Sequence, residues 1–238
     1  MIDKFKFKPF INTIFIHIPK TAGWSLYDYV FDLDVFFSWY LGVKLTKEDT
    51  TITNPEEYKS ITIGHIYYKS LLDEKYMSID YYDKAFKFCF VRNPYDRIVS
   101  LYKYHNVEKI LKLDFDTFIE LLYNEFKLKR VPPVGLYNIK TFHEDSPLYH
   151  EKITGNQYNE MIKWIPPDIG YIGRFENYEQ NVNELLIILG YVGKPIKIPK
   201  LNASKGESDY KIYYKKPMTI KYVKAIYIHD IRRFGYKF

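Results

Sequence analysis

The sequence predicts an α/β protein of three layers, with a mostly parallel central sheet between helices. Short apolar stretches rich in Ile, Phe and Val alternate with amphipathic stretches of helical period. The stretch 85–91 is apolar along nearly its whole length, which is typical of a strand buried on both faces. The 238 residues are enough for one domain with a full-sized core, so we expect a single domain over 1–238.

The expected elements follow one another without an internal repeat or a low-complexity linker. Period-two alternation with β-branched and aromatic residues predicts strands, and apolar residues three and four positions apart predict helices. The expected strands are 12–18, 60–66, 85–91 and 169–175. The expected helices are 25–36, one that begins at Asn93-Pro94, 115–126, 178–189 and a last one over 220–234. The proline-rich segment 130–168 is expected to be irregular.

Local signals fix where some of these helices begin and end. Asn93 is a good N-cap, and Pro94 suits the first helical position. Either Asp114 or Asp116 can cap the helix at 115–126, and Gly190 ends the helix that precedes it. These signals support the predicted alternation of strands and helices.

The net charge is +6 and the pI is about 9.0, which suits attraction of an anionic nucleotide or polysaccharide. The lysines are spread along the chain, so we interpret most of them as solvated surface and expect no nucleic-acid partner. A single cysteine, Cys89, excludes an intrachain disulfide and a multi-cysteine metal site, and its place in KFCFV predicts a buried apolar role. No signal peptide or membrane span is evident, which favours a soluble cytoplasmic protein; the oligomeric state stays open.

The most informative stretch is TIFIHIPKTAGWSL, where an apolar strand breaks at Pro19 and a helical pattern follows. Gly23 permits close approach of the backbone to a ligand, Lys20 supplies a mobile charge, and the amides of the residues from Thr21 to Ser25 are expected to point toward one region. The order of residues is not that of a Walker A loop. An ordinary strand-to-helix turn with a solvated Lys is the alternative.

A second junction of the same kind is FCFVRNPYDRIVSLY. Arg92 follows a buried strand, where a guanidinium needs a carboxylate or a phosphate as its partner. Ser100 lies about two helical turns further on. An ion pair between Arg92 and Asp96 is the alternative interpretation. Two phosphate-type junctions at the carboxyl ends of strands suggest a ligand with anionic groups at both ends.

Together these stretches resemble the sulfotransferases, specifically the Golgi-type carbohydrate sulfotransferases and their bacterial and viral relatives. IFIHIPKTAGWSL resembles the 5′-phosphosulfate loop of that family, and FCFVRNPYDRIVSLY resembles its 3′-phosphate motif. The stretch YIGRFENYEQNVNELLIILG and the terminal FGY also fit, whereas about 107–168 matches weakly. This chain has Trp24 where the family usually has Thr or Ser after the loop Gly.

The resemblance implies a P-loop-like fold and the donor 3′-phosphoadenosine 5′-phosphosulfate (PAPS), with 3′-phosphoadenosine 5′-phosphate (PAP) as product. It implies that Lys20 and the amides of Thr21, Ala22, Gly23, Trp24 and Ser25 hold the 5′-phosphosulfate. It places the 3′-phosphate on Arg92 and Ser100. Lys205 and Gly206 are candidates for a further clamp near the nucleotide, with a flexible linker as the alternative. The acceptor is expected to be a carbohydrate, bound by the segment 107–168. No metal is expected, because a sulfuryl group carries less charge than a terminal phosphoryl group.

Transfer to a hydroxyl needs a general base, and His suits neutral pH. His65 is the expected base, since Gly64-His65 ends a predicted strand and resembles the Gly-His of the uronosyl 2-O-sulfotransferases; a His satisfied within the fold is the alternative. His143, His150 and Glu176 are the other candidates for this role.

Three further histidines have other expected places. His17 is expected to be structural, His105 to pack or cap a helix, and His229 to be exposed.

Two other functions compete with sulfuryl transfer. One is a module of the same fold that binds a nucleotide or polyanion without turnover. The other is a nucleotide kinase, for which the sequence shows neither a Walker-type Lys nor evident Mg²⁺ ligands.

Overall fold

The computed structural model describes residues 11–26, 30, 34–35, 60–62, 65–73, 77–135, 141–198 and 209–238. The chain forms two compact units, each assembled from two stretches of sequence. The first unit comprises Met1–Val91 and Trp164–Ala203, and the second comprises Arg92–Lys163 and Ser204–Phe238. The single domain expected over 1–238 stays a prediction.

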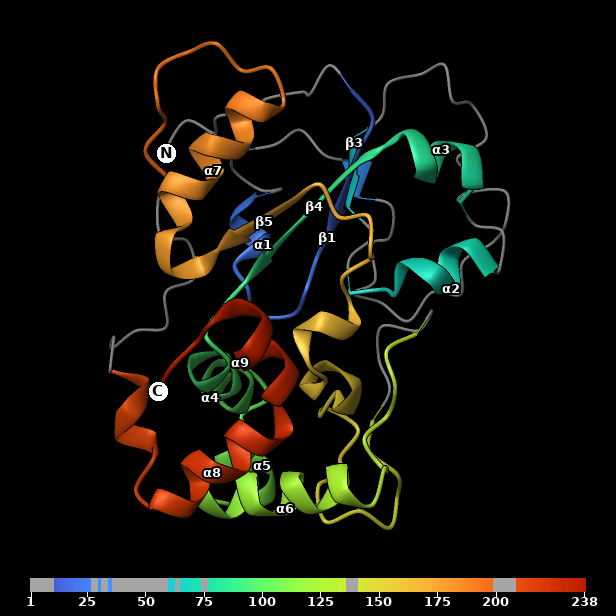
Figure 1. Cartoon of the computed structure of the whole chain (residues 1–238). Coiled ribbons are helices and arrows are strands. Elements are labelled where there is room, and N and C mark those ends of the chain that lie inside the picture. Colours follow the sequence, from blue (N-terminus) through green and yellow to red (C-terminus); the bar gives the residue numbers. More distant parts are fainter. Residues whose placement is uncertain are drawn as a thin grey trace. The chain divides into compact units, whose positions relative to one another are not determined.

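The first unit contains a five-stranded sheet in the order β2-β3-β1-β4-β5 (Figure 1). Its strands are β1 (Thr13–Ile16), β2 (Asp34–Val35), β3 (Ser60–Thr62), β4 (Phe86–Val91) and β5 (Tyr171–Arg174). Every pair of neighbouring strands in this sheet is parallel, and in the central pair Ile16 lies opposite Cys89. The predicted α/β class and the mostly parallel sheet are therefore confirmed.

Helices cover both faces of this sheet. Alternate side chains of each strand point to opposite faces, so both faces carry side chains that the helices bury. Phe15 and Phe88 stack on each other and pack against α7 (Tyr178–Ile188) on one face. On the other face, Lys87 lies over the ring of Tyr82 from α3 (Ile79–Lys84). Figure 1 shows α7 on one side of the strands and α3, with α2 (Tyr68–Asp73), on the other. The first unit thus has the three predicted layers.

Two predicted elements of the first unit differ in the structure. The helix expected over 25–36 begins earlier, with α1 (Gly23–Ser25), and its predicted end is wrong because Asp34–Val35 form β2. Strand β2 pairs with Ile61 and Thr62 of β3, a partner far away in the sequence. Asp and Val are weak helix formers, so pairing with a distant strand can override a local helical pattern. Cys89 is buried in β4, as its sequence context predicts.

The second unit is helical in its described part. Its helices are α4 (Pro94–Tyr104), α5 (Val107–Leu111), α6 (Phe115–Lys127), α8 (Pro217–Ile226) and α9 (Ile228–Phe234), with 3-10 turns at Gly155–Tyr158, Met161–Lys163 and Tyr210–Tyr213. Figure 1 shows α4 among α6, α8 and α9. The apolar faces of these helices form one core, whose members include Ile98, Leu101, Phe118, Leu122, Leu148, Tyr158, Val223 and Tyr227.

The predicted caps are confirmed at two helices of this unit. The Asn93 side chain accepts a hydrogen bond from the Tyr95 amide at the start of α4. Of the two candidates at α6, Asp114 is the cap, and it accepts from the Thr117 amide. The irregular character predicted for 130–168 also agrees with the described residues, which contain only short 3-10 turns and one isolated bridge before Trp164.

The prediction of a single helix over 220–234 is wrong, because the helix is interrupted at Tyr227, which separates α8 from α9. The Tyr227 backbone leaves helical geometry (φ −112°, ψ 32°), and its buried hydroxyl donates to the Tyr158 carbonyl at 2.8 Å. The Glu160 carboxylate accepts from the His229 amide at the start of α9. Both partners come from a distant segment, so the periodic sequence of 220–234 does not reveal the break.

Asp230 ties α9 to the irregular segment of the same unit. Its fully buried carboxylate accepts hydrogen bonds from the amides of Met161 (2.7 Å) and Ile162 (2.8 Å). Burial raises the pKa of Asp230 to about 6, although the two amides and the Arg97 guanidinium oppose this shift. Without this side chain the two amides would lose these acceptors, and a buried backbone donor without a partner costs free energy.

We expect Asp230→Asn to lower the free energy of unfolding by about 2 kcal/mol at pH 7, because an amide oxygen can replace only one of the two carboxylate acceptors. Because folding raises the pKa of Asp230, protonation of its carboxyl group stabilises the folded state below about pH 4, and this contribution is lost as the pH rises through about 6. The free energy of unfolding of the variant should lack this dependence on pH. Urea unfolding at pH 4 and at pH 7 measures both effects. Glu120→Gln, on the exposed face of α6, is the control. Equal stability of variant and parent at pH 7 would contradict the prediction.

Candidate active site

The turn after β1 has an unusual backbone. Lys20 (φ 66°) and Ala22 (φ 71°) both adopt the left-handed conformation, which is uncommon for residues other than glycine. Strained residues of this kind cluster at binding and catalytic sites, and left-handed residues belong to the backbone nests that bind anions. Helix α1 follows at once. The backbone therefore supports the prediction that residues 20–25 form an anion-binding turn.

Gly23 is required here by a close approach. A Cβ atom at this position would lie 2.1 Å from Cδ2 of His17, so no larger residue fits without displacing the imidazole. The His17 ring is itself fixed, because it stacks on Phe15 with 5.2 Å between the ring centroids. His17, expected to be structural, is thus part of the wall against which the turn packs.

Tyr178 holds the turn from the side of α7. Its hydroxyl donates to the Ala22 carbonyl at 3.2 Å, its side chain is hydrogen-bonded to that of Ser25, and burial raises its pKa. Tyr178 lies within a stretch that resembles the family, yet no sequence signal distinguished it from the many other tyrosines of the chain. Its role depends on a contact across more than 150 residues, 156 in the case of Ala22.

Two hydroxyls of the turn point into the first unit. The Thr21 hydroxyl is fully buried and donates to the Ile18 carbonyl at 2.9 Å. Ser25 is nearly buried, and its amide donates to the Ala22 carbonyl at 3.2 Å. The role of these groups toward the donor stays a prediction. The Trp24 side chain lies outside the described residues, as do Gly64 and 204–206 with the possible clamp residues Lys205 and Gly206.

His65 is oriented by a hydrogen bond from its ring. Its Nδ1 lies 2.8 Å from the carbonyl oxygen of His17. Because a carbonyl only accepts, Nδ1 must carry the proton of this bond, which leaves Nε2 of a neutral ring as an acceptor. This is the tautomer that a base needs if Nε2 is the atom that removes a proton.

Lys20 and His65 both act on the imidazole of His17. The rings of His17 and His65 lie 4.2 Å apart between centroids. The pKa of His17 is lowered, first by burial and then by the charges of His65 and Lys20. The structure therefore brings the predicted cation and the predicted base together around a neutral His17, close to where β1 ends.

The predicted 3′-phosphate residues belong to the second unit. Arg92 makes a bidentate ion pair with Asp96, in which Nε and Nη2 donate to the two carboxylate oxygens at 2.7 and 2.9 Å. This is the pair weighed above as the alternative to a phosphate. Ser100 lies on α4 and is partly exposed. The pair holds the guanidinium beside the N-terminus of α4, which favours negative charge.

The other base candidates occupy varied surroundings. Nδ1 of the exposed His143 lies 2.6 Å from the Asp145 carboxylate, and Nδ1 of His150 accepts from the Lys152 amide. Glu176 is exposed in the 3-10 turn Phe175–Asn177.

The remaining histidines lie where they were expected. His105 is the C-cap of α4 and is buried. His229 is 64% exposed beside Glu160.

A five-stranded parallel sheet with a cationic, left-handed turn after a central strand defines an α/β protein of the class that binds anionic ligands beyond the carboxyl ends of its strands. A model of the sulfotransferase family matches residues 3–237, and the chain belongs to this family. It is therefore a transferase of sulfuryl groups. No curated protein and no solved structure matches the chain.

The described residues contain no group of three or more His, Cys, Asp or Glu side chains that could hold a metal ion. None of the helices in this part of the chain has both the length and the apolar character that a membrane crossing requires.

Proposed function

We propose that the chain transfers a sulfuryl group from PAPS to a hydroxyl or amine of a carbohydrate acceptor. The observation that carries the proposal is that Lys20, on its left-handed turn, and His65, whose Nδ1 bonds to the His17 carbonyl, each act electrostatically on His17. A cation and a properly oriented base are the two groups that this transfer needs from the protein.

In the proposed reaction, His65 Nε2 removes the proton from the acceptor as the acceptor oxygen or nitrogen forms a bond to sulfur. The bond between sulfur and the phosphate oxygen breaks, and PAP leaves with the electron pair. Lys20 stabilises the charge that accumulates on this departing oxygen. In-line geometry and a loose transition state are expected, by analogy with phosphoryl transfer.

The donor is proposed to bind through both of its anionic ends. Lys20 and the amides of the turn hold the 5′-phosphosulfate, and Arg92 and Ser100 hold the 3′-phosphate, as the resemblance implies. Family membership supports this assignment, because the transfer of sulfuryl groups is the activity of the family. The proposed soluble, metal-independent enzyme acts on a nucleotide donor and a glycan.

Two measurements test the proposal. Isothermal titration calorimetry with PAP tests donor recognition, and transfer of radiolabelled sulfate from PAPS to a panel of glycans tests turnover. We expect both to be positive, with turnover unchanged by EDTA. Tight PAP binding without transfer to any acceptor would instead favour a nucleotide-binding module, and absence of PAP binding would overturn the proposal.

Replacement of Arg92 by Ala is expected to weaken PAP binding by about 10- to 100-fold, because a charged hydrogen-bonding partner of the 3′-phosphate is lost. Calorimetry with PAP measures the effect. Adenosine 5′-phosphate lacks the 3′-phosphate and should bind parent and variant equally. Asp96→Asn is the matched control, since it removes the internal partner of Arg92 and keeps the guanidinium. Equal affinity of Arg92→Ala and parent for PAP would show that the 3′-phosphate binds elsewhere.

A further inference from the structure

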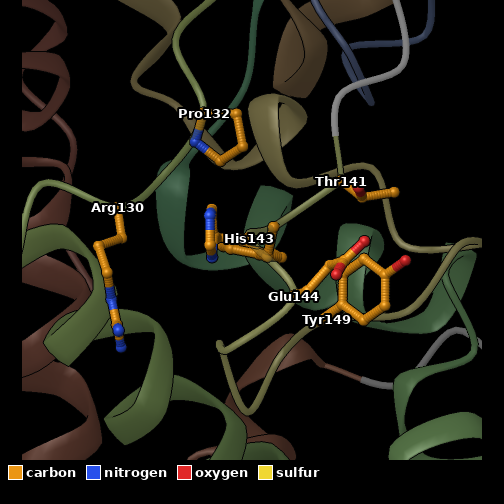
Figure 2. Close-up of a pocket in the computed structure, with 7 residues that line it drawn as sticks. Arg130, Pro132, Thr141, His143, Glu144 and Tyr149 are labelled. Carbon is orange, nitrogen blue, oxygen red and sulfur yellow. The ribbon is translucent and has the colours of Figure 1, made fainter.

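We infer that a cleft within the second unit binds an uncharged sugar ring of the acceptor. The inference rests on the proposed function and adds to it the charge of the saccharide. The cleft has a volume of about 460 Å³ and is lined by Arg130, Pro132, Thr141, His143, Glu144 and Tyr149, with Phe142 (Figure 2). A volume of this size suits a small ligand such as one or two sugar rings.

The walls of the cleft are held in place by tight packing. Thr141 and Thr154 form an antiparallel bridge that closes the segment between them. At Gly155, a Cβ atom would lie 3.1 Å from both Phe142 and Pro132, so these lining residues pack directly on its backbone. Phe142 is 1% exposed and belongs to the core of the second unit. The described lining therefore rests on the core of this unit.

Arg130, the only Lys or Arg among the lining residues that the structure describes, is already paired with a carboxylate. Its Nη2 lies 2.6 Å from Oε1 of Glu125, whose side chain is 1% exposed. Loss of the cation would leave an uncompensated charge on a buried carboxylate, which strongly destabilises a folded protein. Arg130 is therefore committed to Glu125, unlike Arg92, whose partner Asp96 is 24% exposed and can be solvated when an anion binds. Arg130 thus has little charge to offer to a sulfate or uronate in the cleft.

Two further carboxylates lie at the cleft in the described part of the chain. Glu144 lines it, and Asp145 follows in the chain and bonds to the lining residue His143. The hydrogen bond from His143 lowers the pKa of Asp145, so this carboxylate stays ionised at neutral pH. Arg130 faces two carboxylates, because Oδ2 of Asp145 also lies 3.8 Å from its Nη1. With Glu144 as a third carboxylate, the described surroundings have an excess of negative charge, which repels an anionic sugar and favours one that carries only hydroxyl and amide groups.

Tyr149 and Glu144 provide the contacts that such a sugar needs. Tyr149 is 39% exposed and lines the cleft together with Glu144 and His143, all three labelled in Figure 2. An exposed aromatic ring can pack against the apolar face of a sugar, and a carboxylate accepts hydrogen bonds from its hydroxyls. The Thr141 hydroxyl adds a further polar group to the lining.

Saturation-transfer NMR of the full chain with two disaccharides tests the inference. N-acetyllactosamine is uncharged, and the disaccharide of glucuronate joined by the same β1→4 linkage to N-acetylglucosamine replaces its galactose by glucuronate. We expect the uncharged disaccharide to bind about tenfold more tightly, and Tyr149→Ala to weaken it by about tenfold, the effect of one aromatic contact. Glu144→Gln combined with Asp145→Asn should raise the affinity for the glucuronate compound.

Controls separate the cleft from the rest of the protein. Tyr104→Ala removes an exposed tyrosine of the same unit outside the cleft and should leave binding unchanged. Tyr149→Phe keeps the ring and should bind nearly as well as the parent. The inference is overturned if neither disaccharide binds, if the glucuronate compound binds more tightly, or if Tyr149→Ala binds as well as the parent. PAP titration of the same samples reports on the proposed function independently, because it needs no acceptor.

Discussion

Lys20→Met is expected to reduce kcat for sulfate transfer by about 10²- to 10³-fold, with a smaller loss of PAP affinity. Methionine keeps the apolar stem of the lysine but removes the charge that stabilises the departing oxygen, and removing one preorganised contact of this kind has an effect of that size. Lysine and methionine have a similar cost in the left-handed conformation of position 20 (φ 66°), so the substitution adds no new backbone strain. Single-turnover kinetics with radiolabelled PAPS measures the effect.

A second measurement on the same variant distinguishes the charge of Lys20 from a purely structural role of its side chain. Because the charge of Lys20 helps to lower the pKa of His17, Lys20→Met should raise that pKa, which an NMR titration of the imidazole detects. Lys129→Met, a left-handed lysine in the second unit, is the matched control and should change neither value. Retention of full turnover by Lys20→Met would remove Lys20 from the proposed mechanism.

His65→Ala is expected to lower kcat by about 10²- to 10⁴-fold, which is the usual contribution of a general base. In the proposed mechanism this side chain does not contact the donor, so the affinity of the variant for PAP should stay close to that of the parent. Added imidazole should restore part of the activity, because the small base can enter the space that the side chain leaves. Acceptor sulfation in the presence and absence of imidazole measures both effects.

The other candidate bases supply the controls for this prediction. His143→Ala, His150→Ala and Glu176→Gln should each keep a kcat near that of the parent. All three side chains lie at least partly exposed, so their replacement is not expected to disturb the fold. A near-normal kcat for His65→Ala together with a large loss in one of these three would transfer the role of base to that residue.

Much of the fold follows from local sequence. Strand 85–91 is recognised from its apolar run, and the start of α4 from the cap Asn93 followed by Pro94, because these signals act over a few residues. The predictions for Asp34–Val35 and for Tyr227 are wrong, because the conformation of these residues depends on partners far away in the sequence. The short helices α2, α3 and α5 were missed, since they show too few turns for a clear period.

The candidate site shows the same division. Lys20 and His65 are chosen from the sequence alone, since their residue types and their places after predicted strands suit the chemistry. The supporting residues His17 and Tyr178 were not, because their roles consist of contacts with Gly23 and Ala22. A strand residue that faces the core and one that supports a loop have the same sequence pattern.

By itself, then, the sequence determined the α/β class, the family and the residues on which the proposed chemistry depends, because strand and helix periods and the motif residues are local properties of the chain. Only the tertiary structure decided that the chain forms two compact units, that Nδ1 of His65 donates to the His17 carbonyl, and that Arg130 pairs with the buried Glu125. Each of these depends on which groups come within a few ångströms of one another, and distant segments must pack before those distances exist.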